Sequence, residues 1–444
     1  MPWGRPRHEL LLLALVAIAA LTPLQRTTPQ DTSHFCLSRA LEHGRLTVDG
    51  CVGDVEDRSA YGGHLYSNKA PGLAVLATPV AAVLDLHPPT VMRANPTWRL
   101  WVVRVLTSGL AFVICAFMVG RVAEGLAPGH GGAVLVTFAL GTLVAPFAAA
   151  GFDHVPTATL GFAAFLVAWR RRPLASGLLA GAALLCEYEA AIVVVAIGVY
   201  VAVRAGRTAL RYALGVLPGA ALLAAYDWAA FGAPWHGPLR YSDNRYRVAH
   251  EQGLFGLHLP TGHGIRLTLG WPFGLLVVSP VLVAAAAGLV LLWRRGLRAE
   301  AATCAAITVA FVVAELGYFD PYGGWSPGPR FLVPALPFLA LGLAPALQRA
   351  PIATLVLAAA SIAATTALTL VWSVHIDFPH TIWPAIVRVP LDGTASLLAH
   401  VLPHDVLDAV VGDPLRAAVI CAITAAAACL LALTSLRPSP TRSS

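Results

Sequence analysis

The sequence predicts an all-α membrane protein that crosses the bilayer many times. Of its 444 residues, 57% are hydrophobic and only 12% are charged, and the mean hydropathy is +0.70. A soluble domain has about 25% charged residues, so most of this surface must face lipid. Apolar runs long enough to cross a hydrocarbon core of about 30 Å recur along the chain. These runs are continuous and do not alternate with polar residues, which favours helices over the strands of a membrane barrel.

Hydropathy predicts about twelve spans. They lie near residues 9–24, 101–123, 132–150, 155–169, 173–188, 190–203, 210–227, 271–293, 301–318, 331–348, 352–373 and 415–435. The first is read as an uncleaved span, because no small-residue cleavage site follows it.

The arginines predict the orientation of these spans. The clusters at 169–172, 204–207 and 293–298 fall on one side, with both chain ends, if the N-terminus is cytoplasmic. This orientation accounts for much of the formal charge of +7, so no nucleic-acid partner is expected. The prediction is one transmembrane domain, residues 1–444, in the cytoplasmic membrane. Its extracytoplasmic loops are residues 25–100, 228–270 and 374–414.

Positive charge is also retained in the predicted extracytoplasmic loops. Lys69 is the only lysine in the chain, and Arg58, Arg245 and Arg330 lie on the same side. A single loop arginine is best interpreted as a solvated charge, but the set favours an anionic ligand. Glu187 lies at the end of an apolar run, where a carboxylate is costly unless it has a function.

The cysteines and histidines indicate no metal and no cofactor. Cys36 and Cys51 both lie in the first loop, where a disulfide is possible outside the cytoplasm, although the sequence fixes no geometry. The other five cysteines lie in or beside apolar runs and are interpreted as small buried residues. The histidines lack the close spacing of a structural metal site.

The first loop carries a recognisable order of motifs, "DTSHFCLSRALEHGRLTVDG" at 31–50 and "YGGHLYSNKAPGLAVL" at 61–76. It resembles the first periplasmic loop of the GT-C superfamily of membrane glycosyltransferases. The most similar pattern is that of the polyprenyl-phosphate-dependent enzymes, such as the aminoarabinose transferases and the protein O-mannosyltransferases. In that pattern Asp31 matches the leading acid, Arg39 and Ala40 match the core of a juxtamembrane helix, and Lys69 matches a lysine-proline turn.

Two later segments resemble the same family. In "GFDHVPTATLGFAAFLVAW" (151–169), Asp153 matches the second acidic motif, and in "PGPRFLVPALPFLALGLA" (327–344), Arg330 opens an Arg-aromatic-Leu-x-Pro segment. The chain departs from the pattern at Thr32, where most members have a second acid, and at Ala70, which replaces a proline. An extra segment, "CVGDVEDRSA" (51–60), adds Asp54 and Asp57.

The resemblance implies a GT-C fold with juxtamembrane helices in the first loop. Together with the loop charges and Glu187 described above, it leads to a set of predicted site residues. Asp31 and Asp153 are predicted to be catalytic, with Asp54 and Asp57 as alternative bases. The predicted substrate-binding residues are Lys69, His34, Arg58, Tyr66, Arg330, Arg245 and Glu187. A neighbouring helix is expected from Ser33 to His43, with Phe35, Leu37 and Leu41 facing the membrane.

The function expected from this resemblance is inverting glycosyl transfer. The donor would be a polyprenyl-phosphate sugar in the bilayer, and the acceptor an extracytoplasmic glycan, lipid or protein of the cell envelope. Cations beside the donor phosphate would stabilise the charge that develops as it leaves, and a carboxylate would deprotonate the acceptor hydroxyl. The alternatives are a transporter or flippase for a lipid-linked or anionic solute, and a non-catalytic protein of envelope assembly.

Overall fold

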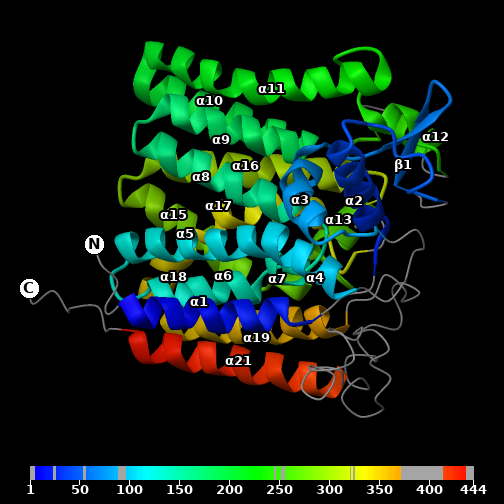
Figure 1. Ribbon diagram of the computed structural model, residues 1–444. Helices are drawn as coiled ribbons and strands as arrows, with labels where there is room; N and C mark the ends of the chain where they lie inside the picture. Colours follow the sequence, from blue (N-terminus) through cyan, green and yellow to red (C-terminus); the bar gives the residue numbers. More distant parts are fainter. Residues whose placement is uncertain are drawn as a thin grey trace, which may run out of the picture.

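The structure is a computed structural model that describes residues 6–23, 27–53, 57–88, 97–244, 247–251, 256–320, 322–323, 326–371 and 414–436. Helices of very different lengths lie side by side in layers and form a bundle (Figure 1). They are α1 (Pro6–Leu21), α4 (Trp98–Arg104), π-helix η1 (Val105–Gly109), α5 (Leu110–Leu126), α6 (Gly131–Gly141), α7 (Val144–Ala148), α8 (His154–Trp169), α9 (Pro173–Cys186), α10 (Ala191–Ala205), α11 (Ala209–Phe231), α15 (Val281–Arg294), α16 (Arg298–Gly317), α17 (Leu336–Ala340), α18 (Leu343–Arg349), α19 (Pro351–Val371) and α21 (Pro414–Ser435).

Shorter elements gather at one end of this bundle (Figure 1). They are α2 (Pro29–Glu42), β1 (Arg58–Tyr61), β2 (His64–Ser67), α3 (Gly72–Val83), α12 (Arg247–Glu251) and α13 (Gly262–Leu269). The remaining pieces are α14 (Leu275–Val278) and the 3-10 turns η2 (Tyr188–Ala190), η3 (Gly206–Thr208), η4 (Pro238–Tyr241) and η5 (Arg330–Ala335).

Helices occupy the regions of all twelve predicted spans, but their lengths differ. Four stretches are long and apolar enough to cross a membrane, or five if a pair bent by 55° is counted as one, and six more apolar helices are shorter. The chain is therefore a multi-pass membrane protein, and the number of about twelve spans stays a prediction. The four stretches are Trp98–Leu126, Tyr188–Phe231, Arg298–Gly317 and Pro351–Leu370.

Prolines divide one span that the sequence analysis treats as continuous. The predicted span at 271–293 is helical only in α14 and, after Ser279 and Pro280, in α15. Proline lacks the backbone N–H that a continuing helix requires, and it disfavours helical geometry in the residue before it. The helix that spans most of this segment is therefore shorter than predicted.

The first loop folds into a compact unit around a β-hairpin that the all-α prediction does not include. β1 and β2 pair antiparallel with Tyr61 opposite His64, and Gly62 and Gly63 both have positive φ in the turn. A two-residue turn of this kind requires φ > 0 at both positions, which glycine adopts at little cost. A disulfide between Cys36 and Cys51 joins α2 to the segment before the hairpin.

Helix α2 starts earlier than expected and faces protein. It begins at Pro29, so Asp31 lies inside its first turn. Phe35 and Leu37 are fully buried against neighbouring elements and do not form the membrane-facing surface that the sequence analysis expects. α2 packs on α3, and both cover the end of the bundle (Figure 1).

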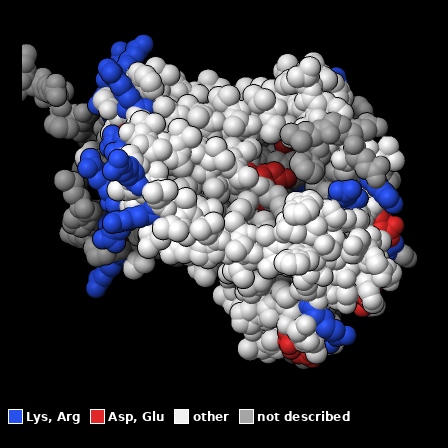
Figure 2. Space-filling model, turned by 90° about the horizontal axis from the view of Figure 1, so that it is seen from above, with Lys and Arg blue, Asp and Glu red and all other residues white. Residues whose placement is uncertain are grey.

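The two ends of the bundle differ in charge. Lys and Arg side chains gather at the end where α1 begins, and Asp and Glu side chains lie in a hollow nearer the other end (Figure 2). The connections from α8 to α9, from α10 to α11 and from α15 to α16 carry the arginine clusters. This arrangement separates the arginine clusters from the first loop, as the predicted topology requires. Which end faces the cytoplasm stays a prediction.

Candidate functional site

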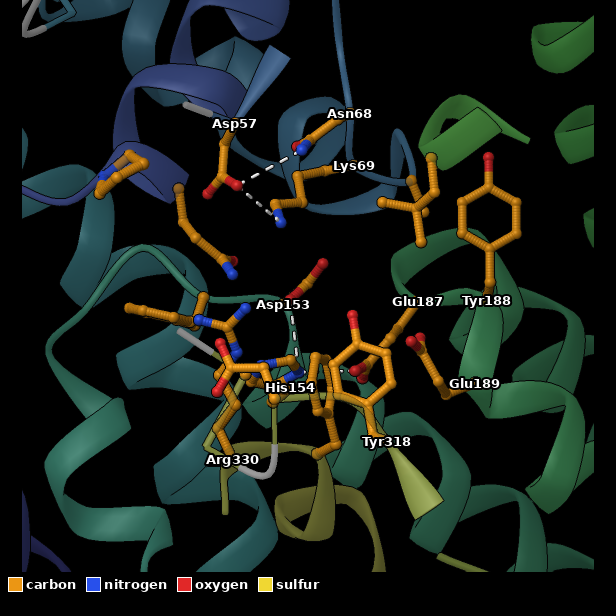
Figure 3. A pocket seen from close by; sticks show the side chains of 18 of the residues that line it. Asp57, Asn68, Lys69, Asp153, His154, Glu187, Tyr188, Glu189, Tyr318 and Arg330 are labelled. Atoms are coloured by element: carbon orange, nitrogen blue, oxygen red, sulfur yellow. Dashed lines mark hydrogen bonds and ion pairs between the residues drawn. The ribbon is translucent and has the colours of Figure 1, made fainter. Parts of the chain in front are cut away.

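A cavity of about 120 Å³ lies between the first loop and the adjacent ends of α8, α9 and α16. Its lining includes five carboxylates and two fixed cations, together with aromatic and amide side chains. The acids are Asp57, Asp153, Glu187, Glu189 and Asp320, and the cations are Lys69 and Arg330. Figure 3 shows Lys69 and Asp153 pointing toward one another across this space.

Lys69 is held in the cavity by the turn between β2 and α3. Its backbone N–H donates to the Ser67 hydroxyl at 3.2 Å, and its Nζ lies 3.4 Å from an Asp57 carboxylate oxygen. Gly72 starts α3, and a Cβ there would lie 2.5 Å from the Leu185 backbone oxygen at the end of α9. Glycine is therefore required for α3 to pack directly against the chain that leads to Glu187.

Asp153 is the buried carboxylate at the start of α8. It makes no side-chain cap on that helix, and its oxygens lie 3.5 Å from His34 Nε2 and 3.5 Å from His154 Nδ1. Burial alone would raise the pKa of Asp153, but contact with His34 and the charge of Lys69 help to outweigh it, and that pKa lies below its ordinary value. This direction favours the ionised form of Asp153 in the cavity.

Glu187 lies between α9 and η2. It contacts His154, which in turn lies beside Asp153. Glu187 Oε1 is 2.6 Å from His154 Nδ1. One ligand atom from each of Asp153, His154 and Glu187 lies within 4.8 Å of the others, so these three residues could hold a metal ion. The direct hydrogen bond between His154 and Glu187 already joins two of them.

Two aromatic rings and a neighbouring glycine position the Arg330 side chain at the cavity. Its guanidinium carbon lies 5.4 Å from the ring centroid of Phe152 and 5.0 Å from that of Phe331, distances at which a cation is attracted to an aromatic face. Gly323 has φ +65°, and a Cβ there would lie 2.7 Å from Arg330 Nε. The glycine therefore provides both the backbone conformation and the space that Arg330 needs.

Asp31, a predicted catalytic residue, does not line the cavity. Its side chain is fully buried and accepts hydrogen bonds from Arg104 Nε at 2.9 Å and Nη2 at 2.6 Å. It also accepts from the Thr28 backbone N–H at 2.7 Å and completes a capping box at the start of α2. An added Cβ at Gly151 would collide with the Asp31 carboxylate, so Asp31 packs against the segment that leads to Asp153.

The other predicted site residues occupy several environments. His34 is buried, and its Nε2 lies within 3.5 Å of Asp153. Tyr66 packs against Phe231 in a separate hydrophobic cluster, and Arg58 pairs with Asp243 at 3.0 Å outside the cavity. Arg245 and the alternative base Asp54 lie outside the described residues.

Two residues of this region were missed by the sequence analysis. Arg104 is a charged residue within the apolar run 101–123, and an arginine in such a run usually has a buried partner. His154 directly follows Asp153, and its hydrogen bond to Glu187 depends on a contact between α8 and α9 that the local sequence does not reveal.

Comparison with solved structures identifies the fold. ArnT from Cupriavidus metallidurans in the apo state matches with a TM-score of 0.53 and 16% identity, over 96% of this chain and 76% of ArnT. ArnT from the same organism bound to undecaprenyl phosphate matches with a TM-score of 0.50 and 14% identity, over 97% and 76% of the two chains. An oligosaccharyltransferase from Archaeoglobus fulgidus gives a TM-score of 0.48 at 12% identity, over 99% and 57%.

No protein-family model matches the sequence, and no curated protein does. The structural matches confirm the predicted fold: the chain has the fold of the GT-C membrane glycosyltransferases.

Proposed function

We propose that this chain with a GT-C fold is an inverting glycosyltransferase that uses a polyprenyl-phosphate sugar. The observation that supports this most strongly is the cavity, in which Lys69 and Arg330 lie on the same side of the molecule as the Asp153 carboxylate. A cation pair and a carboxylate are the two kinds of group that phosphate departure and hydroxyl activation require. Binding of undecaprenyl phosphate by the structurally similar ArnT agrees with this donor class.

In the proposed reaction Asp153 removes the proton from an acceptor hydroxyl. The acceptor oxygen then attacks the anomeric carbon from the face opposite the phosphate, and the bond from that carbon to the phosphate oxygen breaks. The leaving polyprenyl phosphate takes the electron pair, and its charge is stabilised by Lys69 and Arg330. One displacement inverts the configuration of the sugar.

The structure favours Asp153 over Asp31 as the base. Both Asp31 oxygens face Arg104, and the residue does not line the cavity. Asp57 does line the cavity, but it pairs with Lys69. We therefore assign Asp31 a positioning role, because it packs against the 151–153 segment. Glu187 and His34 are assigned the role of neighbours that set the environment of the Asp153 carboxylate.

The location of the reaction follows from the predicted topology. The first loop would be extracytoplasmic in the cytoplasmic membrane, with both chain termini in the cytoplasm. The acceptor would then be a glycan, lipid or protein of the cell envelope.

Mass spectrometry of envelope glycans from a deletion strain tests this function. Loss of one sugar residue, restored by the parental gene but not by an Asp153→Asn gene, is the expected result, and the missing residue names the sugar and its linkage. Dialysis against a chelator should leave the activity of the purified protein intact, because Lys69 and Arg330 supply the positive charge. Unchanged glycans together with altered export of a lipid-linked solute would contradict transferase activity and favour a transporter.

A further inference from the structure

A second cavity, of about 310 Å³, lies at the arginine-rich end of the bundle. It is formed by the connection from α8 to α9 and by the junction of α10 with α11, whereas the candidate active site adjoins the start of α8 and the end of α9. Its volume is at the lower end of the range of about 300–1,000 Å³ that is usual for small-molecule sites. Three arginines line it, namely Arg171, Arg204 and Arg211.

Arg171 occupies a backbone position that favours glycine. The Arg172 N–H donates to the Val167 carbonyl at 3.1 Å and the Arg171 N–H to the Ala168 carbonyl at 2.8 Å. This pair of bonds is the Schellman motif that ends a helix, and Arg171 is its left-handed residue, with φ +57°. Glycine is the usual residue there because it has no Cβ to strain. Strained backbone positions that are occupied by residues other than glycine cluster at functional sites, so this arginine indicates a function for its side chain.

Arg204 is held at the cavity by a buried acid and an aromatic ring. Its Nη2 lies 3.5 Å from Glu300 Oε1, and its guanidinium carbon lies 5.9 Å from the Tyr200 ring centroid. Glu300 also accepts a hydrogen bond from the Tyr200 hydroxyl at 2.8 Å. The buried Glu300 and Tyr200 thus hold the partly exposed Arg204 at the cavity, and the described residues that line the cavity include no acid.

Setting the orientation of the protein in the membrane does not require arginines to line one cavity. Positive charge near the cytoplasmic ends of spans is sufficient to set topology, and arginines such as Arg294 and Arg349 supply it without lining the cavity. Arginine guanidinium groups bind phosphate through paired, charge-assisted hydrogen bonds, and three of them line this cavity. We propose that this cavity is a second anion site, which binds the phosphate group of a phosphate ester.

Two sources of that phosphate can be distinguished by experiment. One is the headgroup of an anionic phospholipid in the adjacent leaflet, and the other is a soluble phosphate ester. The probes are phosphatidylglycerol, with zwitterionic phosphatidylcholine as its control, and sn-glycerol 3-phosphate. Binding to the purified protein in detergent is measured by native mass spectrometry, and the melting temperature is measured with and without each probe.

The variants are chosen so that loss of folding and loss of binding can be separated. Arg171→Gly removes the side chain and relieves the left-handed backbone, so its melting temperature without ligand should equal or exceed that of the parent. Its affinity for the phosphate probe should fall by about tenfold, as expected when a charged hydrogen bond to phosphate is lost. Arg211→Gln should weaken binding similarly. Arg349→Gln, an exposed change at the same end but outside the cavity, should leave binding within about twofold of the parent.

Selective binding of phosphatidylglycerol would identify a lipid site, and binding of glycerol phosphate would identify a soluble ligand. Either result supports the proposal if Arg171→Gly weakens it. The proposal is overturned if neither probe binds, if phosphatidylcholine binds as well as phosphatidylglycerol, or if Arg171→Gly and Arg211→Gln bind like the parent.

Discussion

The Asp31 carboxylate accepts hydrogen bonds from two nitrogens of the Arg104 guanidinium, at 2.9 and 2.6 Å, and neither side chain is exposed. Removing one partner of a buried ion pair leaves an uncompensated charge and costs about 3–5 kcal/mol. Asp31→Asn and Arg104→Met should each lower the free energy of unfolding by about this amount. The double variant should lose less than the sum of the two, as measured by thermal unfolding in detergent. If Asp31→Asn were as stable as the parent but inactive, Asp31 would be catalytic.

Asp153→Asn keeps the shape of the side chain and removes its basicity. Loss of a general base typically reduces a rate by 10²–10⁴-fold, so we expect a fall of this order in the rate of sugar transfer. Donor binding should remain nearly unchanged, because the cations are intact. Turnover at the parental rate would remove Asp153 as the base, and Asp57→Asn would then be the next variant to measure.

Lys69→Ala should weaken use of the donor strongly while leaving membrane insertion intact, because it removes the compact charge nearest the proposed phosphate. Arg330→Ala should have a milder effect of the same kind. The matched control is Arg58→Ala, which removes a first-loop cation that pairs with Asp243 outside the cavity. Steady-state kinetics with varied donor concentration separate these cases. Equal losses for Arg58→Ala and Lys69→Ala would indicate a general effect of loop charge.

The pH dependence follows from the lowered pKa of Asp153. A carboxylate whose pKa lies below its ordinary value stays ionised as the pH falls. It loses its function as a base only when the pH drops to this lowered pKa. The acidic limb of the rate profile should therefore lie below about pH 4, near or under the ordinary pKa of aspartate. A limb near neutral pH that disappears in Glu187→Gln would assign the base to Glu187.

Topology can be measured at Asn244, which lies in the predicted loop 228–270. A cysteine placed there should react with an impermeant reagent in intact cells, because the loop is expected on the outer side. A second cysteine in the α10–α11 connection, at Arg207, should react only after lysis. The opposite pattern would reverse the predicted orientation.

The sequence was sufficient to identify the candidate site residues that lie at the ends of apolar runs. Glu187 could be found because charge is costly near a membrane span, and Lys69, Asp153 and Arg330 because their segments resemble family motifs. All four line one cavity. The order of the motifs at 31–76, 151–169 and 327–344 also predicted the GT-C fold, which the structural comparison confirms.

The role of Asp31 could not be read locally, because it depends on a partner 73 residues away. Arg104 lies in another predicted span, and nothing in the spacing of the two residues indicates their contact. The hairpin was missed for a different reason. Its strands are only four residues long, and its signal, a Gly-Gly turn between short β-forming segments, is weak beside the strong hydropathy of the spans.

The excess of carboxylates in the active-site cavity has a consequence for how the proposed donor binds. Five carboxyl groups and two fixed cations line the space, so a phosphodiester enters where acidic side chains outnumber basic ones. A new anion raises the proton affinity of those carboxylates around it that are still ionised. By linkage, donor binding should then take up a proton from the surrounding solution. Donor affinity would thus respond to the acidity of the compartment that the first loop faces, and loading of the enzyme would be a proton-coupled event.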